Sequence, residues 1–172
     1  MVGLARGTVE LEPYDESWVA VYEREAERLD ALVGEAVEAF AHVGSTAIPG
    51  LPAKPIIDLL AVVPDREAGE RVANTLIEHG YERRPNDDVD GRIFLARGPP
   101  SNRTHYLSVV TPDSDCYREQ LAFRDSLRAH PDVRDAYADL KRDLAAEHGD
   151  DRATYTAAKS EFVESVLDDA LD

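Results

Sequence analysis

The chain has 172 residues, of which 35 are acidic and 19 are lysine or arginine, and its formal net charge of −16 argues against binding to nucleic acids. The longest apolar run is interrupted by Asp58 and is far shorter than the about 20 residues of a membrane helix, and the N-terminus lacks an apolar signal segment. We therefore expect a cytoplasmic protein, in which a single cysteine, Cys116, excludes an internal disulfide and a thiolate zinc site.

Hydrophobic periodicity predicts alternating strands and helices in the first two-thirds of the chain and only helices after that. Glycines and prolines mark the breaks between these elements. In chain order we expect an extended segment over 8–11, a helix over 17–33 that Gly34 closes in the left-handed conformation, a strand over 36–43, a loop over 44–55, a strand over 56–63, a helix from Asp65 to Gly80, a turn over 87–91, strands over 92–97 and 104–110, and helices over 115–129, 133–148 and 153–170.

This order of elements predicts an α+β fold, with a small mixed β-sheet flanked by helices. We expect one domain over 1–172, in which residues 1–112 form the α/β core and the helical part over 113–172 packs on it.

Lysine is almost absent from the chain. Only three of the 19 cationic residues are lysines, namely Lys54, Lys141 and Lys159. Aspartate outnumbers glutamate by 19 to 16. A carboxylate-rich surface keeps a protein soluble where salt is high enough to screen its self-repulsion, so we predict a halophilic protein. The alternative is an ordinary acidic protein from a high-GC genome, which also prefers arginine to lysine.

The segment from 41 to 58 is the most informative part of the sequence. A strand ends at Gly44, a proline-containing loop follows, and the next strand carries Asp58 among aliphatic residues. A carboxylate there is costly unless it meets a cation, a metal or hydrogen-bond donors. The glycine lets the backbone approach a phosphate, and the hydroxyls of Ser45 and Thr46 can donate to phosphate oxygens. The alternative interpretation is a surface turn followed by an aspartate that caps a neighbouring element.

The two runs 42–46 (HVGST) and 54–58 (KPIID) carry a specific pattern. The chain resembles the GrpB-like family, a branch of the polymerase-β-type nucleotidyltransferase fold that also occurs fused to dephospho-CoA kinase as an accessory domain. The chain has no Gly-x-x-x-x-Gly-Lys-Ser/Thr motif, so it is not itself that kinase. Further residues that match the family are Pro13, Tyr14, Asp15, Trp18, Thr104, His105, Leu121, Phe123, Arg124, Asp125, Tyr137, Lys141, Tyr155 and Lys159.

The resemblance implies that the Gly-Ser loop binds a nucleoside triphosphate and that strand carboxylates hold divalent ions, Mg²⁺ or Mn²⁺. Asp58 is present, but the neighbouring strand offers His105 in place of an acid. We therefore expect Asp58 and His105 to face one pocket, as the catalytic residues and the ligands of one metal ion. The alternative is a module that binds a nucleotide or phosphate without transferring it. An acid from the turn, Asp87, Asp88 or Asp90, would restore the enzyme.

The predicted ligand is a nucleotide or another phosphorylated small molecule. A compact ammonium group is a good phosphate partner, and its retention in a lysine-poor chain is suggestive. Three alternatives remain: chance survival of the lysines, a solvated ion-pair face for Arg124 and Arg128, and a packed role for His42. An accessory domain without any ligand is a further interpretation. The residues predicted to bind phosphate are Gly44, Ser45, Thr46, Lys54, Arg124, Lys141 and Lys159.

Overall fold

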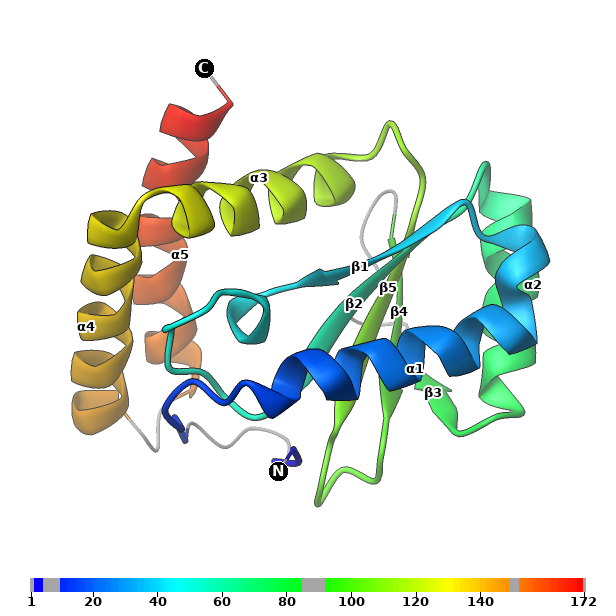
Figure 1. Cartoon of the computed structure of the whole chain (residues 1–172), viewed down its shortest axis with the longest axis horizontal. Coiled ribbons are helices and arrows are strands. Elements are labelled where there is room, and N and C mark those ends of the chain that lie inside the picture. Colours follow the sequence, from blue (N-terminus) through cyan, green and yellow to red (C-terminus); the bar gives the residue numbers. More distant parts are fainter. Residues whose placement is uncertain (1, 5–9, 85–91, 149–151, 172) are drawn as a thin grey trace.

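The computed structural model describes residues 2–4, 10–84, 92–148 and 152–171. Its centre is one mixed sheet in the strand order β1-β2-β5-β4-β3 (Figure 1). Strands β2 and β5 are parallel, and the other neighbouring strands are antiparallel. The strands are β1 (Ala39–Val43), β2 (Ile57–Val62), β3 (Tyr81–Arg83), β4 (Arg92–Arg97) and β5 (His105–Val110).

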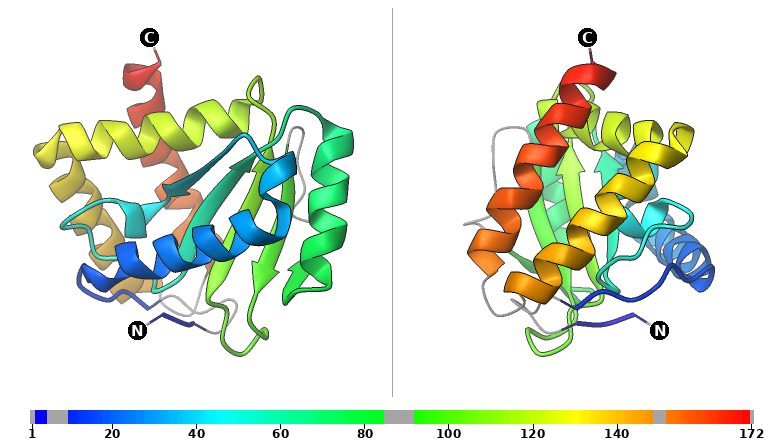
Figure 2. Two further views of the ribbon diagram at one scale, coloured as in Figure 1. Left: turned by 45° about the vertical axis from the view of Figure 1, so that its right-hand side comes forward. Right: turned by 90° about the vertical axis from the view of Figure 1, so that its left-hand side faces the viewer.

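Helices cover both faces of the sheet, which confirms the predicted α+β fold. Two helices, α1 and α2, pack on one face, while α3 crosses the other face and contacts α4 and α5 (Figure 2). None of the described helices has the length and apolar character to cross a membrane. The helices are α1 (Ser17–Val33), α2 (Arg66–Ile77), α3 (Asp115–Ala129), α4 (Pro131–His148) and α5 (Arg152–Ala170).

Side chains of β2 alternate between the two layers, as the two-residue period of a strand requires. Ile57 and Leu59 lie in the core with Trp18 of α1, whereas Leu60 and Val62 pack toward α3. The face that carries Leu60 is also the face of Asp58, because residues two apart on a strand point the same way. The parity of β2 therefore directs Asp58 away from α1 and toward the C-terminal helices.

Most predicted boundaries agree with the structure within two residues, and the exceptions have local causes. Gly34 is in the right-handed conformation, not the left-handed one, because it begins a short 3₁₀ turn, Gly34–Ala36, that delays β1 to residue 39. The strand β3 was not predicted. Residues 8 and 9 of the predicted extended segment 8–11 lie outside the described residues, and the turn 87–91 lies wholly outside them.

Helix α2 begins where the sequence predicts, because the carboxylate of Asp65 accepts a hydrogen bond from the Ala68 N–H at 2.8 Å. Helix α4 begins at Pro131, two residues earlier than predicted, since proline is tolerated in the first turn of a helix.

Candidate functional site

The loop after β1 depends on a glycine at position 44. Gly44 has a φ of +74°, in the region that favours glycine, and it precedes the 3₁₀ turn Ser45–Ala47. A Cβ atom on Gly44 would also overlap the carboxylate of Asp58. Position 44 therefore requires glycine for two reasons, its backbone conformation and its close approach to β2.

Arginines of α3 and α4 hold the loop from its outer side. Arg128 donates to the Ala47 carbonyl from two nitrogens, at 3.0 and 2.8 Å, and Arg134 donates to the Pro49 carbonyl at 3.3 Å. Arg124 donates to the His42 carbonyl at 3.1 Å and is not among the residues that line the cavity described below. The structure thus gives Arg124 a loop-anchoring position and does not bring it to the predicted phosphate site.

His42 is buried and packed, which is the alternative interpretation of this residue. Its ring stacks on Tyr22 with centroids 4.7 Å apart, and its Nε2 lies 2.9 Å from the Thr46 hydroxyl. Burial, aided by the charges of Arg128 and Arg124, lowers the pKa of His42 to about 4. The imidazole is therefore neutral at pH 7, and it fixes the position of Thr46 in the loop.

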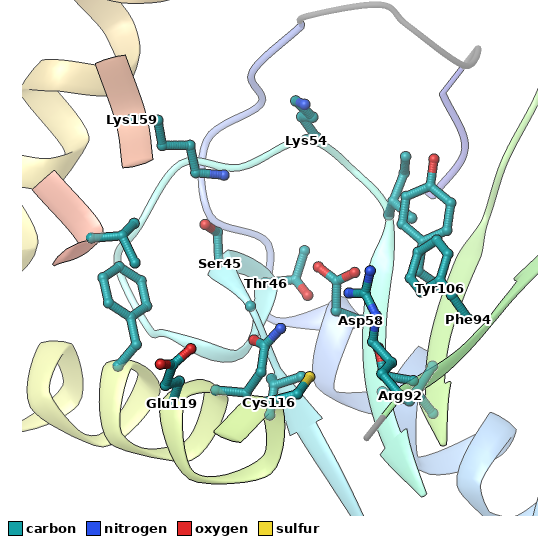
Figure 3. Close-up of a pocket in the computed structure, with 18 of the residues that line it drawn as sticks. Ser45, Thr46, Lys54, Asp58, Arg92, Phe94, Tyr106, Cys116, Glu119 and Lys159 are labelled. Carbon is teal, nitrogen blue, oxygen red and sulfur yellow. The ribbon is translucent and has the colours of Figure 1, made fainter. Parts of the chain in front are cut away.

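A cavity of about 650 Å³ lies between this loop, the sheet and the three C-terminal helices (Figure 3). Ser45 and Thr46 form its edge, and Lys54, Lys141 and Lys159 all line it. Every lysine of the chain therefore lines this one cavity, although Lys54 comes from a loop, Lys141 from α4 and Lys159 from α5. Of the predicted phosphate-binding residues, all except Arg124 meet here.

Lys141 is 2% exposed and joins α4 to the loop. Its Nζ donates to Ser45 Oγ at 2.9 Å and to the Pro52 carbonyl at 2.8 Å, and it lies 5.2 Å from the ring centroid of Tyr137. Burial and the charges of Lys159 and Lys54 lower the pKa of Lys141 well below its usual value. The ammonium group would gain from an anion in the cavity, because such a ligand offsets both effects.

Asp58 lines the same cavity from β2. Among the described residues, none donates a hydrogen bond to its carboxylate or forms an ion pair with it. Burial raises the pKa of Asp58 to about 6, and the positive charges of Lys159 and Lys54 offset only part of that effect. A carboxylate held this way is a candidate ligand or base, because its charge is costly until another group meets it.

His105 does not face the cavity, so the prediction of a common pocket with Asp58 is wrong. Across the parallel pair of β2 and β5, His105 is in register with Ile57, whereas Asp58 is in register with Tyr106. Ile57 points into the core beneath α1, and His105 lies on that side near Glu25. The two side chains lie on opposite faces of the sheet and cannot share a metal ion.

The face of the sheet that carries Asp58 supplies other residues that were not predicted. Arg92, Phe94 and Tyr106 line the cavity, and the rings of Phe94 and Tyr106 form a tilted pair with centroids 5.3 Å apart. Strand periodicity alone assigns Phe94 and Arg92 to one face, so a signal for this pair existed, but only the register between β4 and β5 shows that Tyr106 joins them.

The metal site implied by the resemblance finds few ligands in the structure. No group of three or more His, Cys, Asp or Glu side chains that could hold a metal ion occurs within the described ranges. Two acids of α3, Asp115 and Glu119, line the cavity together with Asp58. The acids over 87–90 that could restore the enzyme lie outside the described residues.

Comparison with known proteins identifies the family. The sequence profile of the GrpB protein family matches residues 8–169. Glutamate-rich protein GrpB of Alkalihalophilus pseudofirmus is 35% identical over 98% of this chain and 99% of its own length. A crystal structure of the conserved protein GrpB from Enterococcus faecalis is 31% identical, with a TM-score of 0.83 over 95% of this chain and all of that one.

Longer proteins also match. UPF0157 protein YqkA of Bacillus subtilis is 35% identical over 94% of this chain, and dephospho-CoA kinase of Mycolicibacterium paratuberculosis is 30% identical over 98%; the chain spans 47% of each. A Cid1 poly(U) polymerase structure with bound MgATP superposes over 79% of this chain and 43% of that chain, with a TM-score of 0.53 and 10% identity. That likeness shows a nucleotidyltransferase-like fold. The chain belongs to the GrpB family.

Proposed function

We propose that this protein binds a nucleotide, or another small molecule with a polyphosphate group, in the cavity edged by Gly44, Ser45 and Thr46. One observation carries the proposal: a chain with 35 acidic residues places all three of its lysines around a single cavity. Electrostatic self-repulsion makes it costly to gather cations unless an anion compensates them. Phosphate is the anion that fits an ammonium group and a hydroxyl-rich loop best.

Different parts of the cavity lining suit different parts of a nucleotide. In the view of Figure 3, Lys159 lies on the side of Ser45, Lys54 lies between Ser45 and the aromatic pair, and Phe94 and Tyr106 lie beyond Asp58. Ammonium groups and hydroxyls suit phosphates, and an aromatic pair suits the flat face of a base. We place the phosphates against the loop and the base toward the aromatic pair.

A second candidate, nucleotidyl transfer, is favoured by Asp58, which lies beside the loop and whose carboxylate has a raised pKa. In that function Asp58 would accept the proton of an attacking hydroxyl or hold a divalent ion. The described acids do not fit a two-metal centre. The two candidates differ in turnover and share the same binding site.

Thermal-shift measurements test the binding proposal. The four nucleoside triphosphates, the diphosphates and inorganic triphosphate are each added to wild type and to Lys159→Gln. A ligand at a hundredfold excess over Kd stabilises the folded state by about 2.7 kcal/mol, which a melting curve resolves. The control is Arg71→Gln, because Arg71 is exposed on α2, which covers the opposite face of the sheet.

Binding through the lysines predicts a shift that Lys159→Gln reduces and Arg71→Gln preserves. A larger shift with nucleoside triphosphates than with inorganic triphosphate supports the placement of the base on the aromatic pair. If none of these compounds shifts wild type, the proposed function fails. Pyrophosphate release in the presence of a cell extract, lost in Asp58→Asn, would establish transfer as well as binding.

A further inference from the structure

We infer that this cavity binds polyphosphate without a divalent cation, because Lys54, Lys141 and Lys159 supply the positive charge that metal ions supply in a two-metal site. The inference rests on the proposed function and names the form of its ligand, the uncomplexed polyphosphate anion.

A second carboxylate could share a metal ion with Asp58 only from a few neighbouring strand positions. These positions carry other residues. On β2 itself, the neighbours on the same face are Ile56, just before the strand, and Leu60. On β5, the same face presents Tyr106 and Ser108, which also line the cavity. These side chains offer at most hydroxyls, and Mg²⁺ prefers carboxylate ligands in protein sites.

Strand β4 adds a cation close enough to influence Asp58. Arg92 of β4 lines the cavity, and its positive charge lowers the pKa of Asp58. A guanidinium group near a carboxylate competes with a metal ion for that carboxylate. It repels the ion, and it neutralises the negative charge that would bind the ion. Asp58 is therefore surrounded by fixed positive charge from Arg92 and the lysines.

Charges are separated along the cavity. In the view of Figure 3, Lys54 and Lys159 lie at the top of the cavity, and Glu119 and Cys116 lie at the bottom, where α3 forms the wall. Phosphates placed against the loop would meet the charges of Lys54, Lys141 and Lys159, which all line the cavity. This end of the cavity can neutralise several phosphate charges without an added ion.

Lys141 is preorganised for this role. Its Nζ is fixed by Ser45 Oγ and the Pro52 carbonyl, so no side-chain rearrangement is needed before an anion binds. An ammonium group has three donors, and these two bonds leave one for a ligand. Because the group is buried, its attraction for a phosphate is weakly screened by water and salt.

Isothermal titration with a non-hydrolysable ATP analogue tests the inference, in buffer with EDTA and in buffer with Mg²⁺. Metal-free recognition predicts that Kd in EDTA lies within about threefold of Kd in Mg²⁺. Lys54→Gln should weaken binding about tenfold or more in both buffers, since a charge-assisted hydrogen bond is lost, while Arg71→Gln leaves it unchanged.

Asp58→Asn gives a second readout of opposite sign. In EDTA the variant removes a negative charge near the phosphates, so binding should tighten about tenfold. If Asp58 instead held a bridging ion, the same substitution would weaken binding in the Mg²⁺ buffer. Binding in Mg²⁺ that EDTA abolishes would overturn the inference and leave the proposed function standing. The absence of binding in both buffers would overturn both.

Discussion

Replacement of Asp58 by asparagine should stabilise the protein, because the carboxylate is costly in the unliganded fold. Burial raises its pKa from 3.8 to about 6. Each pKa unit corresponds to 1.36 kcal/mol, so the folded state loses on the order of 1–3 kcal/mol when this group is ionised. The amide of asparagine keeps the shape of the side chain and carries no charge. At pH 7 we expect the variant to be more stable than wild type by that amount.

The pH dependence of this difference gives the sharper assay. A raised carboxyl pKa favours the folded state fully below the unfolded value of 3.8, and that contribution is lost as pH rises through about 6. Urea unfolding of wild type and Asp58→Asn should therefore give a small difference near pH 4 and the full difference at pH 7. Other titrating groups cancel in the comparison.

An exposed carboxylate provides the control. Asp139 is 76% exposed on α4, so Asp139→Asn should change the free energy of unfolding by less than about 0.5 kcal/mol at either pH. The prediction is wrong if Asp58→Asn is less stable than wild type at pH 7, or if the difference in free energy of unfolding between them does not change with pH. Either result would mean that the Asp58 carboxylate is stabilised in the fold.

Further predictions concern the loop, the core and the surface. Gly44→Ala should cost about 2 kcal/mol or more in urea unfolding, because its φ of +74° and the overlap with Asp58 both add strain, and an unchanged stability would contradict this. Glu25→Gln should cost about 2 kcal/mol, since the buried carboxylate accepts from Tyr81 at 2.6 Å and from Arg97 at 2.7 Å, whereas the exposed Glu23→Gln should be neutral. Burial lowers the pKa of His42 and His105 to about 4, so the folded state resists their protonation and loses stability as pH falls from about 6.5 through 4. Circular-dichroism melts should therefore show a lower melting temperature at pH 5 than at pH 7. The melting temperature should also rise with KCl up to molar concentrations, and a flat or falling series would end the halophilic prediction.

The elements were predictable where burial follows a simple period. Helix α1 occupies 17–33 as expected, because its apolar residues recur at helical spacing and cover the sheet. Strand β3 was missed because its sequence, Tyr-Glu-Arg, is short and mostly polar. It exists through its pairing with β4, in which Tyr81 is opposite Arg97, and such a pairing is not visible in local sequence.

The site was predictable in its residues more than in its geometry. The period of β5 assigns His105 and Tyr106 to opposite faces, but the face that meets Asp58 depends on the register with β2. A shift of one residue would exchange them. The meeting of Lys141 with Ser45 likewise depends on how α4 packs against the loop, a contact between residues 96 positions apart. Lysine scarcity pointed to these residues, and tertiary packing determined where they meet.

A crystal structure of the complex with a non-hydrolysable triphosphate analogue would show whether the lysine-lined cavity is a polyphosphate site. We expect phosphate density against Ser45 and Thr46, within hydrogen-bond distance of Lys141 and of Lys54 or Lys159. Density for the phosphates elsewhere on the protein, with this cavity empty at saturating ligand, would contradict it.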